Sequence, residues 1–496
     1  MTAPAAPHTV HIQTVYTVCA RAELAARRLE REGESTLDSR VTDATLWRML
    51  GARRVAVVGA SADPTKFGAI LLQSLISGGY SGEIFPVNPK AERIAGLQCY
   101  PSVADIPGSL DLVVIVVPAP AVLTVIEQAA DKGAAGVFVI SGGFKESGRP
   151  DLERAVVEAT HRRGMRLFGP NTQGIAYAAN NLSAVFWPVL TTPGPVGVVG
   201  QSGTVVAALT DWAQAEGLGV SASISLGNQA DVCESDVLRF LCDDDATRSV
   251  ALYLEGVSDG PRFIDALKHV AVRMPIVVLK CGRSPRGCEA VASHTGSLAG
   301  SDEVFSGLCR QYGVLRAADT ESLFDTAKIM ATMPLPAGNR LLMMSSSGGS
   351  CALAADVAFD QGLELPAPSD DFVAALKSLD LPEWGSFANP LDLGGVSLDG
   401  FRAAVELADA ADLADVILLV YGDPIDGADR LALELAATTK AAICAAVFGG
   451  ASVEQEQRWT MQRGGVPVFP SPERAVRAIG ASCWYAQRRR TLEARA

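Results

Sequence analysis

Short apolar runs recur along the chain from Arg54 onward, and most of them end in small or polar residues. The first series comprises the runs at 54–61, 83–89, 112–120, 135–144 and 165–174. Continuous apolar runs of this kind are typical of parallel strands that are buried on both faces of a sheet. The segments between them have helical patterns, and strands that alternate with helices predict right-handed crossovers in a doubly wound sheet.

Two further series of the same kind follow the first. They comprise the runs at 196–205, 221–231, 249–257 and 275–284, and then those at 340–358, 416–424, 441–450 and 466–470. Segments rich in Pro and Gly, at 191–197 and 333–339, separate the series. The pattern therefore predicts an α/β fold of three consecutive doubly wound domains, at 46–188, 189–334 and 335–496. Residues 1–45 carry no strand signal and form an N-terminal extension.

The length, apolar content and net charge of the chain limit the kinds of molecule that it can be expected to bind. The length of 496 residues agrees with three domains at about 150 residues each, and 48% of the residues are apolar. The net charge of −13 offers no electrostatic footprint for nucleic acid or an anionic membrane. No apolar stretch reaches the ~18 residues of a membrane span, and no signal peptide is apparent.

The ten cysteines are scattered, without a paired C-x-x-C and without a histidine at zinc-site spacing. We therefore expect buried thiols, a reducing cytoplasm and no metal site.

Ligands of doubly wound sheets bind at the carboxyl ends of the strands, so the polar residues there are candidates. GQSGTV (200–205) places Ser202, Gly203 and Thr204 between a strand and an apolar helix. Free amides at a helix start, together with the helix dipole, form a site for a phosphate-sized anion. A tight strand-to-helix turn also needs glycine, so packing alone is the competing interpretation.

His294 is the most informative of five histidines. It lies in ASHTGSLAGSD (292–302), which we interpret as a loop rich in small residues and hydroxyls that then opens a helix. A neutral imidazole there is a competent nucleophile toward phosphorus. Glu255 ends a buried strand, where a carboxylate needs a partner. An imidazole N–H is one such partner, and a salt bridge or helix cap is the alternative.

GASADPTKFG (59–68) is similar to a dinucleotide-binding loop but lacks the G-x-G-x-x-G order. The next strand ends in VNPK (87–90) rather than in an isolated acidic residue. Nicotinamide binding is therefore disfavoured, whereas another nucleotide-like ligand stays open. Lys66 and Lys90 could meet phosphates at this edge, although exposed lysines usually serve only solvation.

From about residue 46 to its end, the chain resembles the α part of ADP-forming acyl-CoA synthetases, relatives of succinyl-CoA synthetase. The resembling motifs stand in the family's order: GASADPTKFG (59–68), VNPK (87–90), VVPAP (116–120), ISGGF (140–144), GPNTQG (169–174), GQSGTV (200–205), LGNQAD (226–231), YLEGVSDG (253–260), SHTGSLAGSD (293–302) and NPLDLGG (389–395). The resemblance implies a Rossmann-like CoA-binding domain followed by two flavodoxin-like domains.

The resemblance also implies residue roles. His294 would be the phosphorylated residue, Glu255 would hold its other ring nitrogen, and Ser202, Gly203 and Thr204 would cradle the phosphoryl group. Gly227 and Asn228 would lie near the acyl group. CoA would be bound by Gly59, Ala60, Ser61, Lys66, Phe67, Val87, Asn88, Lys90, Pro118, Ser141 and Gly142.

The family also needs an ATP-grasp domain, which loads phosphate from ATP onto the histidine, and no segment of the sequence has its glycine-rich, lysine-bearing nucleotide loop. The expectation is an acid–thiol ligase α subunit in an oligomer with a separate ATP-grasp β subunit, which alone would hold ATP/ADP and Mg²⁺. It would join a small carboxylic acid to CoA. A CoA-binding regulatory module without turnover, or a nicotinamide-dependent dehydrogenase, is the alternative.

Overall fold

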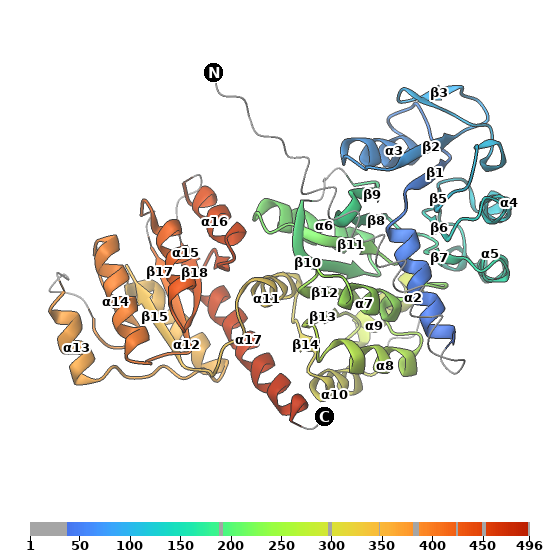
Figure 1. Cartoon of the computed structure of the whole chain (residues 1–496). Coiled ribbons are helices and arrows are strands. Elements are labelled where there is room, and N and C mark those ends of the chain that lie inside the picture. The colour runs from blue at the N-terminus through green and yellow to red at the C-terminus, as the bar shows by residue number, and fades with distance from the viewer. Residues whose placement is uncertain are drawn as a thin grey trace, which may run out of the picture.

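Three α/β units follow one another along the chain, as Figure 1 shows from blue through green to red. The computed structural model describes residues 37–187, 192–295, 300–346, 348–379, 386–422, 425–448 and 453–494. Side chains of residues 37–43, 293–295 and 453 are outside this description. The order of the units confirms the predicted fold class.

The first unit is a parallel sheet with helices on its two faces. Its elements are β1 (Arg54–Val58), α3 (Phe67–Ser77), β2 (Glu83–Val87), β5 (Leu112–Ile115), α4 (Ala119–Asp131), β6 (Gly136–Val139), α5 (Pro150–Arg162) and β7 (Arg166–Phe168), with a small hairpin of β3 (Arg93–Ile94) and β4 (Leu97–Gln98). The strands pair in the order β2-β1-β5-β6-β7. The inner strands β5 and β6 are buried at every position, which explains their continuous apolar sequences.

The second unit adds an antiparallel hairpin to the same plan. Its elements are β8 (Gly174–Tyr177), β9 (Leu182–Val185), β10 (Pro193–Gly200), α6 (Gly203–Ala215), β11 (Val220–Ser225), α7 (Glu234–Cys242), β12 (Ser249–Leu254), α8 (Gly260–Val270), β13 (Ile276–Lys280), α9 (Pro285–Thr295), α10 (Asp302–Tyr312), β14 (Leu315–Arg316) and α11 (Thr320–Thr332). The order is β14-β13-β12-β10-β11-β8-β9. Strands β8 and β9 precede the predicted boundary at residue 188 yet pair with the second sheet.

The third unit is again a parallel sheet. Its elements are β15 (Leu341–Ser345), α12 (Gly348–Asp360), α13 (Asp370–Lys377), β16 (Leu391–Asp392), α14 (Leu398–Ala410), β17 (Val416–Tyr421), α15 (Ala428–Thr438), β18 (Ala442–Val447), α16 (Val453–Arg463), β19 (Val468–Phe469) and α17 (Pro472–Glu493). The order is β16-β15-β17-β18-β19. In the parallel part of each of the three sheets, the second strand lies on one side of the first, and the third, fourth and fifth strands follow on the other side. Each unit thus has a switch point beside its first strand, where ligands of such sheets bind.

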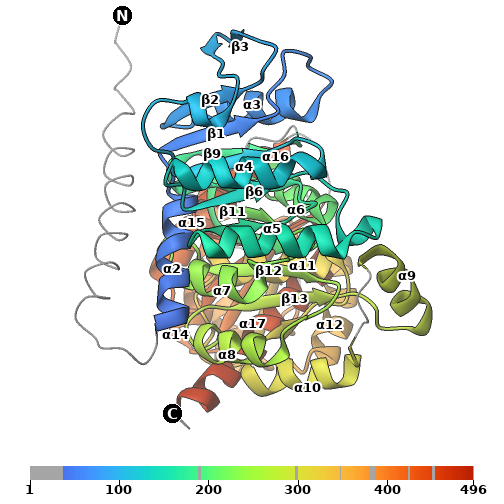
Figure 2. The same cartoon turned by 90° about the vertical axis from the view of Figure 1, so that its right-hand side faces the viewer.

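Helix α2 (Leu37–Leu50) precedes the first strand and runs along the first and second units (Figure 2). Leu46, Met49 and Leu50 are fully buried, and the Trp47 ring lies 4.5 Å from that of Phe240 in α7. The predicted extension at 1–45 therefore ends inside a helix that packs against both units. Residues 1–36 lie outside the description.

The first two units are joined along β7. The segment 228–232 runs beside this edge strand, with backbone hydrogen bonds from Asn228, Ala230 and Val232 to residues 167–170. Arg166 of β7 donates to both carboxylate oxygens of Asp231 at 2.9 and 3.0 Å and to Asp236 at 3.3 Å. A loop of the second unit thereby covers the open edge of the first sheet.

The second and third units share one hydrophobic core, which includes residues of α11 and of α17. At its centre Lys328 is fully buried and donates to Glu216 at 2.7 Å and to the carbonyl of Val468 at 2.9 Å. Tyr485 of α17 donates to the carbonyl of Ala271 at 3.1 Å. Figure 1 shows α17 lying between the two units.

Candidate active site

Helix α6 begins with amide groups that are open to a ligand. Its N-cap, Ser202, has an extended backbone, and its side chain makes no capping hydrogen bond in the described structure. The N–H groups of the first turn, at Gly203 and Thr204, therefore point from a helix N-terminus toward the carboxyl edge of the second sheet. This arrangement suits a phosphate-sized anion.

The first unit presents its own carboxyl edge. Gly59, directly after β1, has a φ of +90°, a conformation that favours glycine, and its N–H donates to the carbonyl of Val87 at 3.1 Å. Asn88 donates from Nδ2 to the carbonyl of Ala60 at 2.7 Å. The loops after β1 and β2 are thus tied together. Lys66, the N-cap of α3, and Lys90 are exposed beside them.

A cavity of about 500 Å³ joins the two edges. It contains four of the residues that were predicted for CoA (Phe67, Pro118, Ser141 and Gly142) and the three that were predicted for phosphate (Ser202, Gly203 and Thr204). Its lining also includes Val116, Val117, Ile140, Asn171, Thr172, Gln173 and Phe186. Loops that are widely separated in the sequence therefore meet in one space that has both apolar and polar walls and a helix N-terminus at one side.

The remaining predicted residues lie outside this lining. Ser61 borders a second cavity of about 590 Å³, formed with α3, Ile94 and Trp187. Val87 ends β2. The loops of the first carboxyl edge carry Gly59, Ala60, Lys66, Asn88 and Lys90, and the second unit carries Gly227, Asn228, Glu255 and His294.

Glu255 directly follows β12 and is 5% exposed. Its backbone N–H and that of Gly256 both donate to Oε1 of Gln201, the latter at 3.0 Å. Gln201 precedes the N-cap of α6, so the strand end that carries Glu255 is tied directly to the start of the anion site.

His294 has a different backbone from the one predicted. It lies in the last turn of α9, not in a loop that opens the following helix. The helix begins at Pro285, a residue that suits a first helical position, and Ser284 accepts the N–H of Gly287 at 3.1 Å. The helical run PRGCEAVASHT therefore ends just beyond the histidine, whose side chain is outside the described part of the chain.

Gly227 and Asn228 form a turn against the first unit. Gly227 has a φ of +61°, and a Cβ there would lie 2.4 Å from the carbonyl oxygen of Pro170. Asn228 donates from Nδ2 to Glu146 at 2.6 Å and to Glu153 at 2.8 Å. Glu146 in turn accepts the N–H groups of Gly143 and Phe144. The Asn228 side chain is thus engaged by two carboxylates of the first unit, and the place near the acyl group that the resemblance implied stays a prediction.

Known proteins show the same combination of parts. Residues 53–178 match the family model of a CoA binding domain, and residues 193–330 match that of the succinyl-CoA ligase like flavodoxin domain. The acetate–CoA ligase [ADP-forming] I subunit alpha of Pyrococcus furiosus is 39% identical over 454 residues, which are 88% of this chain and 97% of that subunit. The chain belongs to the family of ADP-forming acyl-CoA ligases.

Two further comparisons place this family member. The acetate–CoA ligase [ADP-forming] I of Archaeoglobus fulgidus is 38% identical over 87% of this chain, which spans 62% of that longer relative. The solved dinucleotide forming acetyl-coenzyme A synthetase 1 of Ca. Korarchaeum cryptofilum, in complex with phosphate and ADP, has a TM-score of 0.82 and 35% identity. It covers 90% of this chain, and 97% of its own chain is matched. Among the described helices of this ligase-family chain, none has the length and apolar character to cross a membrane.

Sequence reasoning missed several residues that line the cavity of this ligase-family chain. Gln173 lies over the start of α6, because a Cβ at Gly203 would meet its Cγ at 2.3 Å, and it donates to Thr204 at 3.4 Å. Phe186 packs against Phe67, with ring centroids 4.9 Å apart. Gln173 could have been found, since it follows a strand end within GPNTQG. Phe186 gave no signal because it follows a hairpin strand that was not predicted.

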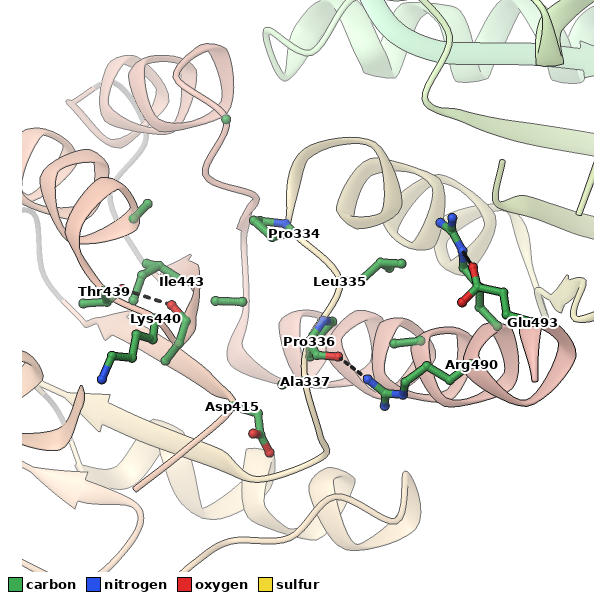
Figure 3. A pocket seen from close by; sticks show the side chains of 16 residues that line it. Pro334, Leu335, Pro336, Ala337, Asp415, Thr439, Lys440, Ile443, Arg490 and Glu493 are labelled. Carbon is green, nitrogen blue, oxygen red and sulfur yellow. Dashed lines mark hydrogen bonds and ion pairs between the residues drawn. The ribbon is translucent and has the colours of Figure 1, made fainter. Parts of the chain in front are cut away.

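Two other clusters lie apart from this site. At the amino edge of the third sheet, a cavity of about 430 Å³ is bordered by the linker 334–337 and by α17 (Figure 3). Among its charged groups, Arg490 donates to the carbonyl of Pro336, Arg489 donates to Glu493, and Asp415 accepts from Arg340. Cys242, Asp243 and His269 also converge, but Arg273 lies among them, 2.8 Å from Asp243 and 2.9 Å from His269. The Arg273 guanidinium therefore lies where a metal ion bound by these three residues would have to lie.

Proposed function

We propose that this chain is the α subunit of an acyl-CoA ligase that forms acyl-CoA, ADP and phosphate from a carboxylic acid, CoA and ATP. The observation that carries the proposal is the shared cavity, in which the loops of the CoA-binding unit meet the open N-terminus of α6. The two matching family models and the name of the Pyrococcus furiosus relative support it. A partner subunit of the ATP-grasp type supplies ATP and its Mg²⁺.

The reaction proceeds through phosphorylated His294. The partner transfers the γ-phosphoryl group of ATP to an imidazole nitrogen, so that a P–N bond forms as a P–O bond breaks and ADP leaves. A carboxylate oxygen then attacks phosphorus, which releases the imidazole and gives an acyl phosphate. Finally the CoA sulfur attacks the carbonyl carbon, the C–O bond breaks and phosphate leaves. Amides at the start of α6 stabilise the charge that stays on the phosphoryl oxygens throughout.

The first unit is proposed to hold CoA along its carboxyl edge. The loops after β1 and β2 offer backbone groups, and Lys66 and Lys90 are exposed cations beside them for the CoA phosphates. The thiol end then reaches Pro118, Ser141 and Gly142 in the shared cavity. The acyl group lies against the apolar part of the lining, next to the anion site.

Phosphorylation of the chain by the reverse half-reaction tests this proposal. Acetyl-CoA and inorganic phosphate are incubated with the purified chain, and phosphate on the peptide that contains His294 is measured by mass spectrometry under basic conditions. The phosphate is expected on the wild-type peptide and absent from His294→Ala, because only the imidazole can accept it.

His294→Ala should bind CoA as tightly as the wild type, since the predicted CoA contacts belong to the first unit. Equal phosphate incorporation by His294→Ala and the wild type would refute the phosphohistidine route. A chain that binds CoA but takes no phosphate would instead favour a CoA-binding regulatory module.

A further inference from the structure

Gln201 connects the two strand ends that the proposed reaction uses. It lies between Gly200, the last residue of β10, and Ser202, the N-cap of α6. Its main-chain N–H donates to the carbonyl of Tyr253 in β12 at 3.2 Å. The backbone of Gln201 therefore connects the anion site at the start of α6 with β12, the strand that leads to Glu255.

The Gln201 side chain uses its full hydrogen-bonding capacity on this junction. Oε1 accepts the N–H groups of Glu255 and Gly256, while Nε2 donates to the carbonyl of Gly256 and to Oε1 of Gln229, both at 2.7 Å. A neutral amide has two lone pairs and two N–H donors, and all four are engaged. A carboxylate in the same place could accept the two N–H groups, but it would face the two oxygens without a proton to donate.

The network continues into the buried part of the second unit. Gln229 has a φ of +52°, an unusual value for a residue other than glycine, and donates from Nε2 to Glu234 at 2.9 Å. Glu234 is 1% exposed, and burial raises the pKa of its carboxyl. Gln229 thus fixes the Gln201 side chain by a hydrogen bond, and Gln201 in turn fixes the turn at Glu255–Gly256.

We propose that Gln201 is a positioning residue that sets the Glu255 carboxylate relative to the amides at the start of α6. This inference rests on the proposed function, in which Glu255 orients the imidazole of His294. Because Gln201 holds the Glu255 N–H, displacement of its side chain moves the Glu255 Cα and its carboxylate. The amides of Gly203 and Thr204 belong to the next residues of the same backbone, so one side chain governs the separation of the two groups.

The test compares Gln201→Glu with Gln214→Glu in the phosphorylation assay with acetyl-CoA and inorganic phosphate. Gln214 lies near the end of α6, where its Oε1 accepts only the N–H of Thr192, at 3.1 Å, so a carboxylate can replace it. We expect Gln201→Glu to slow phosphorylation of His294 by about 10²-fold, as a misplacement of about 1 Å can do. The concentration of acetyl-CoA that gives half the maximal rate should stay unchanged, and Gln214→Glu should match the wild type.

Gln201→Met serves as a second variant, since it has a similar length and adds no charge to a partly buried turn. The pH profile of the phosphorylation rate separates positioning from general loss of structure. Both Gln201 variants should shift the profile, because an imidazole that lacks its oriented carboxylate titrates differently. Thermal unfolding identifies any variant that has lost its fold.

A double-mutant cycle with Glu255→Gln decides whether Gln201 acts through Glu255. Gln201→Met should slow the wild type strongly and the Glu255→Gln chain hardly at all. Equal slowing in both backgrounds, or wild-type rates in folded Gln201 variants, overturns the inference and leaves the proposed function standing. A wild-type chain that takes no phosphate overturns the proposed function itself, and the inference with it.

Discussion

At the scale of single residues, Asn228 and Glu146 connect the turn expected to meet CoA with the second unit. Glu146 accepts backbone N–H groups from Gly143 and Phe144, next to Ser141 and Gly142, and its other oxygen accepts from Asn228. The same Asn228 amide donates to Glu153. The position of the turn is therefore set by a residue of the neighbouring unit.

Asn228→Asp should destabilise the junction of the first two units. The new carboxylate would face those of Glu146 and Glu153, and the two hydrogen bonds to these charged groups would be lost. Hydrogen bonds to charged groups contribute about 1.5–3 kcal/mol each, so a loss of about 3–6 kcal/mol is expected. Urea unfolding measures it. Asn181→Asp is the control, because the Asn181 amide donates to the carbonyl of Gly79 at an exposed site; equal losses for the two variants would contradict the prediction.

The junction should also be sensitive to acid. Burial alone would raise the pKa of Glu146, but hydrogen bonds from Asn228, Phe144 and Gly143 lower it below 4.5. A carboxyl whose pKa is lowered by folding contributes stability above its unfolded value, and this contribution is lost as the pH falls through the folded value. Stability of the wild type should therefore decline below pH 4.5. The decline should be shallower in Glu146→Gln, which a series of urea titrations at falling pH would show. If the free energy of unfolding fell equally with pH in both proteins, Glu146 would not contribute to the acid sensitivity.

At the scale of elements, the apolar runs located most strands of the three sheets because these strands are buried on both faces, but the two-residue strands β14 and β16 lie outside the predicted runs. Two other features escaped this signal. Strands β8 and β9 are short and lie before residue 188, in a segment that the sequence pattern assigned to the end of the first unit. Their membership of the second sheet depends on the pairing of β8 with β11, which no local pattern encodes.

The α9 helix shows the other limit. Small residues and hydroxyls around His294 predicted a loop, yet the run from Pro285 has a capping serine before it and continues as a helix to Thr295. The strand-end residues of the site were predictable, since carboxyl edges collect ligands. The side-chain network of Gln201, Gln229 and Glu255 was not, because it depends on how three strand ends meet.

The contact along β7 gives a prediction at this scale. Arg166→Met would deprive Asp231, whose side chain is about 5% exposed, of its guanidinium partner, while Asp236 would keep its ion pair with Arg262. Breaking a buried ion pair on one side typically costs about 3–5 kcal/mol. Arg163→Met is the matched control: Arg163 pairs with Asp131 at the surface, where ion pairs contribute up to about 1 kcal/mol. Urea unfolding of both variants measures the difference, and similar losses would show that the β7 contact depends on backbone pairing alone.

At the scale of the whole molecule, the parallel strands of the three sheets follow one order, but only the first two sheets border the candidate site. The third unit is held to the second by a common apolar core and by the buried Lys328. Its amino-edge cavity lies on the linker side, away from the carboxyl edges of the first two sheets. The third unit therefore packs against the unit that carries the anion site but contributes no residue to the lining of the shared cavity.

The chain alone should not make acyl-CoA from ATP. Among the described residues, the first two units match a CoA binding domain and a succinyl-CoA ligase like flavodoxin domain, and the third unit repeats the order of their parallel strands. Incubation of the chain with ATP, Mg²⁺, acetate and CoA is expected to give no acetyl-CoA by chromatography. Addition of an ATP-grasp subunit should make acetyl-CoA appear. Robust thioester formation by the purified chain would require a nucleotide site within this molecule.

The covering of β7 by residues 228–232 has a consequence for synthesis. A ribosome completes the first sheet well before it delivers the segment that lies along its edge. During that interval the nascent chain exposes unpaired backbone groups and the unsatisfied Arg166 guanidinium, the kind of edge from which strands of different chains pair and aggregate. Productive folding of the first unit therefore waits for the second, and slow translation between residues 168 and 232 should lower the yield of native protein more than slow translation after residue 340.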